Sequence, residues 1–84
     1  RREKARERAQ KAAQQREQAA SDYDRLTAQR KTVLALCEAI EQELSTCTTE
    51  KRRTQLLSKL VTTENRLASI DRRRDKAFSV AFAA

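Results

Sequence analysis

The 84-residue sequence contains no glycine, proline, histidine, methionine or tryptophan. Glycine and proline most often form tight turns, so their absence argues against a domain built from many short elements. Histidine is the side chain that most often serves as a general base near neutral pH, and the chain has none. The sequence therefore predicts a helical protein that is not an enzyme.

Large apolar side chains are also scarce, because 14 of the apolar residues are alanine and only eight are leucine. A lone globule of this size needs a denser core, since small domains bury little of their surface. The two cysteines, Cys37 and Cys47, lack zinc-ligand spacing and any histidine to complete a site. We therefore expect no metal or cofactor, and two cysteines alone suggest a reducing, intracellular setting.

No stretch approaches the roughly 20 apolar residues that a membrane-spanning helix needs. The apolar side chains among residues 1–20 are all alanine, which offers little energy for insertion into a lipid surface, so no membrane partner is expected. The chain opens at Arg1 rather than at a methionine. We expect residues 1–84 to be a single helical segment of a longer protein.

A heptad pattern, in which positions are lettered a to g and apolar residues recur at a and d, spans the first half of the chain. It continues for more than five heptads, which is enough to predict a coiled coil. Residues 1–20 supply only alanine and arginine to this seam, whereas residues 21–47 form its main core. The a positions are Ala9, Arg16, Tyr23, Arg30, Cys37 and Leu44, and the d positions are Ala12, Ala19, Leu26, Val33, Ile40 and Cys47.

After Cys47 the pattern continues in a second phase over residues 48–84. This phase places Leu60, Leu67 and Arg74 at a, and Leu56, Thr63, Ile70 and Ala77 at d. Such a shift resembles the effect of inserted or deleted residues in a coiled coil. The expected dimer core therefore comprises Tyr23, Leu26, Val33, Cys37, Ile40, Leu44, Leu56, Leu60, Leu67 and Ile70.

Two all-α architectures fit this pattern. The first is one nearly continuous helix that pairs in parallel with a second copy to form a homodimer; Leu34 and Leu36 widen the seam enough to permit higher oligomers. The second is an antiparallel helical hairpin with a loop near 45–49, where serine and threonine interrupt the helical propensity. We expect the continuous dimer, because a loop without glycine or proline makes an unusual connection between helices.

Charge is zoned along the chain, whose net charge is +7. Residues 1–31 and 51–76 are basic, whereas residues 32–50 contain four glutamates and no basic residue. Glu38, Glu41 and Glu43 in this acidic zone are expected to be solvated or to receive a basic partner, such as the basic end of a neighbouring rod. Clustered basic side chains predict an acidic polymer as partner. The expected contact residues are Arg1, Arg2, Lys4, Arg6, Arg8, Lys11, Arg16, Lys51, Arg52 and Arg53.

Three stretches carry a resemblance to a known family. They are the opening RREKARERAQKAAQQREQ, the heptad stretch YDRLTAQRKTVLALCEAIEQEL and the basic run EKRRTQLLSKL. Together they resemble the basic coiled-coil segment of the microtubule-binding kinetochore proteins of kinetoplastids. The resemblance implies a parallel coiled coil whose basic residues contact microtubules (tubulin), inside an assembly at the kinetochore in the nucleus. It is also compatible with DNA binding by the parent protein.

Two other functions remain open from the sequence. Duplex DNA could be bound through its phosphates without sequence preference; a leucine-zipper basic region is excluded because the only asparagine, Asn65, lies far from the basic opening. Alternatively, the segment is purely a structural oligomerisation rod whose charges only keep it soluble.

Overall fold

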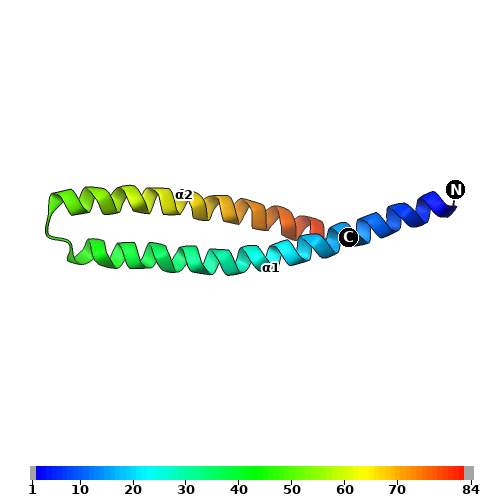
Figure 1. Cartoon of the computed structure of the whole chain (residues 1–84), viewed down its shortest axis with the longest axis horizontal. Coiled ribbons are helices and arrows are strands. Elements are labelled where there is room, and N and C mark those ends of the chain that lie inside the picture. Colours follow the sequence, from blue (N-terminus) through cyan, green and yellow to red (C-terminus); the bar gives the residue numbers. More distant parts are fainter. Residues whose placement is uncertain (1, 83–84) are drawn as a thin grey trace.

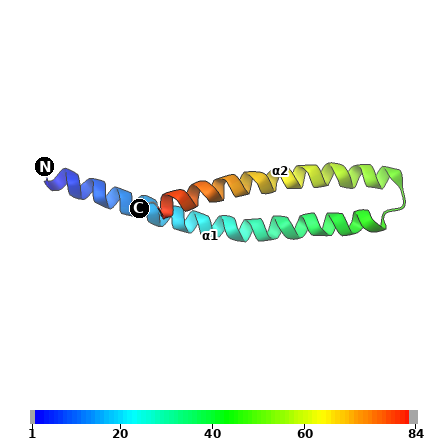
Figure 2. The ribbon, with the colours of Figure 1, turned by 180° about the vertical axis from the view of Figure 1, so that it is seen from behind.

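The computed structural model describes residues 2–82 and consists of two long helices joined by a short loop (Figure 1). Helix α1 spans Arg2–Thr46 and helix α2 spans Glu50–Ala81. The two helices run antiparallel and side by side in both views of the chain (Figures 1 and 2). The resulting rod measures 71 × 15 × 15 Å.

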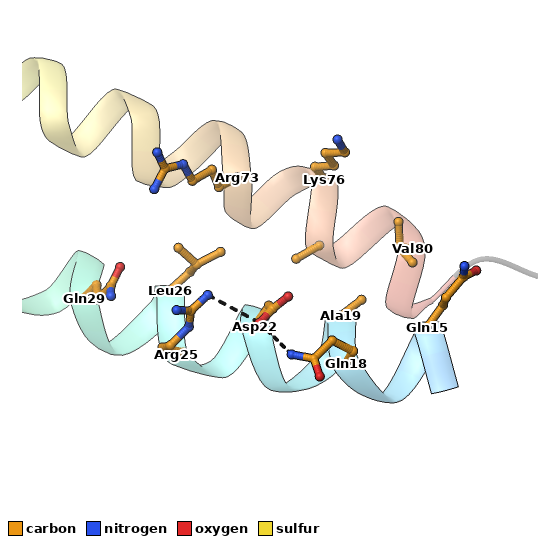
Figure 3. Close-up of a pocket in the computed structure, with 11 residues that line it drawn as sticks. Gln15, Gln18, Ala19, Asp22, Arg25, Leu26, Gln29, Arg73, Lys76 and Val80 are labelled. Atoms are coloured by element: carbon orange, nitrogen blue, oxygen red, sulfur yellow. Dashed lines mark hydrogen bonds and ion pairs between the residues drawn. The ribbon is translucent and has the colours of Figure 1, made fainter. Parts of the chain in front are cut away.

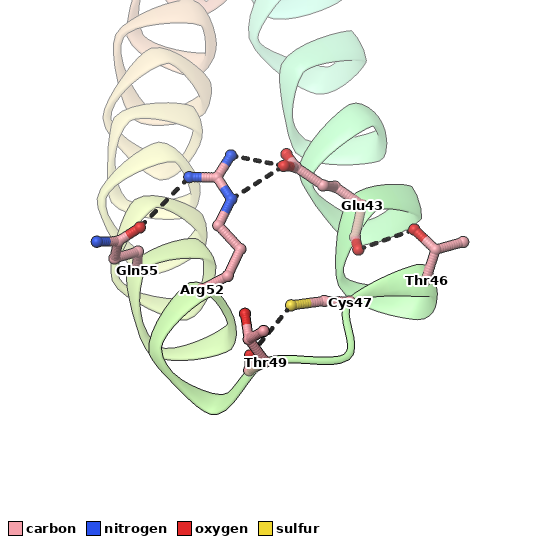
Figure 4. Close-up of polar contacts among 6 residues, drawn as sticks. All are labelled: Glu43, Thr46, Cys47, Thr49, Arg52 and Gln55. Carbon is pink, nitrogen blue, oxygen red and sulfur yellow. Dashed lines mark hydrogen bonds and ion pairs between the residues drawn. The ribbon is translucent and has the colours of Figure 1, made fainter.

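Helix α1 ends at Thr46, where two hydroxyl groups bond to carbonyls of the last turn; Figure 4 shows the bond that Thr46 makes. Ser45 Oγ donates a hydrogen bond to the carbonyl of Gln42 at 2.6 Å, and Thr46 Oγ1 donates to that of Glu43 at 3.2 Å. Hydroxyl groups that bond to nearby carbonyls compete with continuation of the helix. Thr49 then adopts an extended conformation, and its carbonyl accepts the first bond of α2, from the N–H of Arg53 at 3.0 Å.

The expectation of one nearly continuous helix is therefore wrong, and the chain forms the antiparallel hairpin instead. The loop needs no glycine, because no residue between 2 and 82 has a positive φ angle. The chain reverses over residues 47–49, and the last of these, Thr49, has an extended backbone. Folding back also brings the two apolar seams together within one molecule, which avoids the loss of translational freedom that association of two chains requires.

The residues of the seam are those that the heptads predict, although they pack within one chain. All four d positions of the second phase are buried, and Leu56 is completely inaccessible to solvent. In α1 the buried side chains also fall on the a/d stripe. Tyr23, Leu44, Leu60 and Leu67 are half-buried at a positions. The expected dimer core is thus the core of the hairpin: each helix is the partner that a second copy was expected to supply.

The N-terminal part of α1 extends beyond the end of α2, and we call this part the overhang (Figures 1 and 2). Its seam positions, Ala9 and Ala12, are exposed because α2 does not reach them. Helix α2 ends at Ala81, and the N–H of the next residue, Phe82, bonds to the carbonyl of Phe78 at 3.0 Å.

Aromatic and polar contacts join the helices near the end of α2. The ring of Phe78 lies 5.7 Å from that of Tyr23 and 4.7 Å from that of Phe82, measured between centroids. Arg74 donates hydrogen bonds to the hydroxyls of Tyr23 and Thr27, at 2.8 and 2.9 Å. Its guanidinium also lies over the Tyr23 ring, 4.8 Å from the centroid. Arg74 therefore fills an a position, where an apolar residue is usual, because its guanidinium packs on an aromatic ring.

Candidate polyanion-binding surface

The hairpin has two long faces, one on each side of the seam. In an antiparallel pair of helices, positions g and c of both helices lie on one side, and positions e and b lie on the other. Contacts confirm this assignment. Glu43 and Arg52, both at g, form an ion pair, with Arg52 Nε 3.0 Å from Glu43 Oε1. On the opposite side, Asp71 at e accepts a bond of 2.8 Å from Arg30.

The g/c side carries nearly all of its charge as lysine and arginine, and we call it the basic face. Between residues 2 and 82 it has nine basic and only two acidic residues, Asp22 and Glu43. Both acidic residues are paired with basic neighbours on the same face, Arg25 and Arg52. The basic residues are Lys4, Arg8, Lys11 and Arg25 of α1, and Arg52, Lys59, Arg66, Arg73 and Lys76 of α2.

Two shallow grooves follow the seam on the basic face. The first, of about 480 Å³, lies between Arg25 and Gln29 of α1 and Arg73 and Lys76 of α2 (Figure 3). Asp22 also lines this groove, and its carboxylate accepts hydrogen bonds from Arg25 at 3.3 Å and from Gln18 at 3.2 Å. Figure 3 shows both bonds. The second groove, of about 420 Å³, lies nearer the loop and is lined by apolar and hydroxyl side chains with one lysine and one glutamate, Glu43. Its lining includes Leu36, Ala39, Ile40, Leu56, Lys59 and Thr62.

The e/b side is the reverse of the basic face, and we call it the acidic face. Between residues 2 and 82 it has nine acidic residues and only two basic ones, Arg6 and Lys31. Exposed apolar side chains interrupt the acidic residues at two levels of the rod. Leu34, Leu57 and Val61 lie near the loop, whereas Phe78 and Phe82 lie near the end of α2. The acidic residues are Glu3, Glu17, Asp24, Glu38, Glu41, Glu50, Glu64, Asp71 and Asp75.

Cys37 is buried at an a position and lies close to carboxylates of the acidic face. Burial raises the pKa of the Cys37 thiol above 9.0, and the nearby carboxylates of Glu64, Glu41 and Glu38 raise it further. The folded chain thus keeps a proton that the unfolded chain loses above pH 9.0. This thiol therefore contributes to stability at neutral pH, and its contribution is lost as the pH rises through the folded-state pKa.

This environment predicts unequal reactivity of the two cysteines. With an aromatic disulfide reagent at pH 8, we expect Cys47 in the loop to react at least about tenfold faster than Cys37, because the thiolate is the reactive form. Mass spectrometry of the labelled peptides would measure both rates. In denaturant the two rates should become similar. Equal rates in the folded chain would contradict the burial of Cys37.

The predicted contact residues are divided between the two ends of the rod. Of those expected from sequence, Lys4, Arg8, Lys11 and Arg52 lie on the basic face. Arg2 and Arg16 lie on the seam, Arg6 lies on the acidic face, and Lys51 and Arg53 are exposed near the loop. Arg1 lies outside the described residues. The clusters at 2–16 and 51–53 are therefore far apart, and they do not form one compact patch.

The basic residues of α2 that join these clusters are missing from the expected contact set. Arg73 and Lys76 lie in a basic run that is evident in the sequence, but Lys59 and Arg66 are isolated there. The signal that could identify them is their spacing: Arg52, Lys59, Arg66 and Arg73 recur every seven residues. At about 1.5 Å per residue, neighbouring members of this row are about 10.5 Å apart along the helix.

Comparisons with known proteins add no assignment to this surface. The chain matches no family model, no curated protein and no solved structure. Neither α1 nor α2, over residues 2–82, contains a stretch apolar and long enough to cross a bilayer. Within the same residues, no three histidine, cysteine, aspartate or glutamate side chains gather in a way that could hold a metal ion. Any function must therefore be argued from the two faces.

Proposed function

We propose that this chain is a non-enzymatic interaction module that binds an acidic polymer along its basic face. The observation that carries the proposal is the segregation of nine basic and two acidic residues onto one side of an elongated rod. Such an array produces a positive potential that attracts a polyanion and orients the rod along it. The two acidic residues on this face are already paired, so they subtract little from the potential.

A microtubule is the favoured polymer, and duplex DNA is the alternative. The row of basic residues on α2 is regularly spaced along the helix, which suits an extended acidic lattice. The resemblance to kinetoplastid microtubule-binding kinetochore proteins supports the same choice, with a kinetochore-type assembly in the nucleus as the setting.

That the chain forms a homodimer stays a prediction, but the contact between the two copies must differ from the parallel a/d seam expected from the sequence. The a/d seam that was expected to hold two chains in parallel is filled within the hairpin, so a second copy would have to contact the outside of the rod. The purely structural rod is the competing function. It differs from the proposal in one testable way, because it requires no contribution from the exposed charges of the basic face.

Co-sedimentation with stabilised microtubules tests the proposal. We expect the chain to pellet with microtubules at about 50 mM salt and to be largely released by about 200 mM, because ionic contacts to polyanions weaken steeply over this range. Excess duplex DNA should reduce pelleting only modestly. A tube without microtubules corrects for material that sediments by itself. Absence of pelleting at low salt would refute microtubules as the polymer, and complete displacement by DNA would favour DNA instead.

A further inference from the structure

The acidic face remains without a role in the proposed function. It combines a strong negative charge with apolar side chains that are largely in solvent. Leu57 is 48% exposed, Val61 is 56% exposed and Phe82 is 64% exposed. Exposed apolar groups surrounded by charge of one sign indicate an interaction surface, and the partner must be basic with apolar hollows.

The basic face of a second copy has this chemistry. The basic face has nine basic and two acidic residues, whereas the acidic face has nine acidic and two basic residues. The charge balance of one face is therefore the reverse of the other. The basic face also has hollows where the acidic face has exposed apolar side chains. We propose that the acidic face of one chain binds the basic face of another.

The positions of the hollows along the rod support this pairing. The groove near the loop is lined by Leu36, Ala39 and Thr62, at the level of Leu57 and Val61 on the opposite face. The groove near the overhang is lined by Ala77 and Val80, at the level of Phe78 and Phe82 on the opposite face. A second rod laid beside the first in the same direction therefore places both apolar groups over both grooves without any shift along the axis.

The net charge of +7 opposes association of like chains, but its range is short. At physiological ionic strength the screening length is about 8 Å. The rod is 15 Å thick, so each face is screened from the far face of its neighbour and interacts mainly with the near one. Attraction between facing opposite charges therefore dominates over repulsion between whole molecules.

The pairing uses two different surfaces, so it is heterologous and does not close on itself. A stack of any length has one free basic face on one side and one free acidic face on the other. Further copies can therefore bind to either side. The stack still presents a basic face at one side, which could bind the polymer of the proposed function. The inference does not depend on that function, because it concerns contacts between copies of this chain.

Complementary charge-reversal variants test the inference by analytical ultracentrifugation of the 84-residue chain. Variant A has Lys59→Glu, Arg66→Glu and Arg73→Glu on the basic face. Variant B has Glu38→Lys, Glu41→Lys and Glu64→Lys on the acidic face. All six side chains are exposed, so circular dichroism should show unchanged helicity for both.

The wild type should sediment with a mass that rises with concentration to at least twice that of the monomer, and each variant alone should remain monomeric. An equimolar mixture of A and B should associate again, since A retains an acidic face and B retains a basic one. A wild type that is monomeric at every concentration would overturn the inference. It would also be overturned by a mixture that remains monomeric, or by variants that associate as well alone as together.

Discussion

Replacing Leu56 by alanine is expected to destabilise the hairpin by about 2–5 kcal/mol, the usual cost of truncating a fully buried leucine. Leu56 is 0% exposed, the lowest value among the buried hydrophobic residues between 2 and 82. Folded domains have at best about 0.05–0.15 kcal/mol of stability per residue, and a rod with one seam belongs at the low end. The substitution should therefore leave much of the chain unfolded at room temperature.

Urea unfolding followed by circular dichroism at 222 nm measures this effect. The matched control is Leu36→Ala, which removes the same atoms from a side chain that is 47% exposed. The control should cost less than about 1 kcal/mol, because most of that side chain is already in water. If both substitutions had the same effect, the helices would not be packed through Leu56, and the hairpin would be the wrong arrangement of the two seams.

Reversing two charges of the basic face is expected to weaken binding to microtubules at least tenfold. The double variant Arg66→Glu and Arg73→Glu removes two cations from the seven-residue row on α2 and adds two repulsive carboxylates. Neither arginine makes an ion pair with another residue between 2 and 82, so helix packing should be preserved. Co-sedimentation at low salt measures the affinity, and its dependence on salt should become shallower because fewer ionic contacts remain.

A second double variant separates the position of the charges from their number. Lys31→Glu and Arg72→Glu change the net charge by the same amount, but Lys31 lies on the acidic face and Arg72 points away from the seam at an f position. Binding by this control should fall less than threefold, through the long-range field alone. An equal loss in both variants would mean that only the net charge of the chain governs attraction to the polymer, and that the basic face is not a distinct site.

Most of the helical structure and the identity of the buried residues could be predicted from the sequence. Alanine, leucine, glutamine and charged residues with long side chains favour helix throughout, and the heptads identify the stripe that is removed from water. The second phase after Cys47 predicted that Leu56, Thr63, Ile70 and Ala77 would be buried, and all four are. These features follow from local periodicity, which depends on no choice of partner.

The partner of each seam was decided only by the tertiary structure. A heptad pattern specifies which side chains must be covered, and a second copy or a distant part of the same chain can cover them equally well. Here the hydroxyl groups of Ser45 and Thr46 bond to carbonyls of the last turn, and the chain reverses over residues 47–49, where Thr49 has an extended backbone. The absence of glycine and proline pointed toward a continuous helix, but this reversal requires neither residue.

The distribution of charge shows the same division between sequence and structure. Along the sequence, basic residues form zones on either side of an acidic one, and this order predicted binding at 1–16 and 51–53. When the chain folds back, the zones of α2 lie beside those of α1. The antiparallel arrangement places the g positions of the two helices beside each other, and likewise the e positions. A parallel pair would have placed g beside e and mixed the two signs on both sides. The sequence by itself thus determined how much charge the rod carries, whereas the direction of the second helix decided that opposite charges occupy opposite faces.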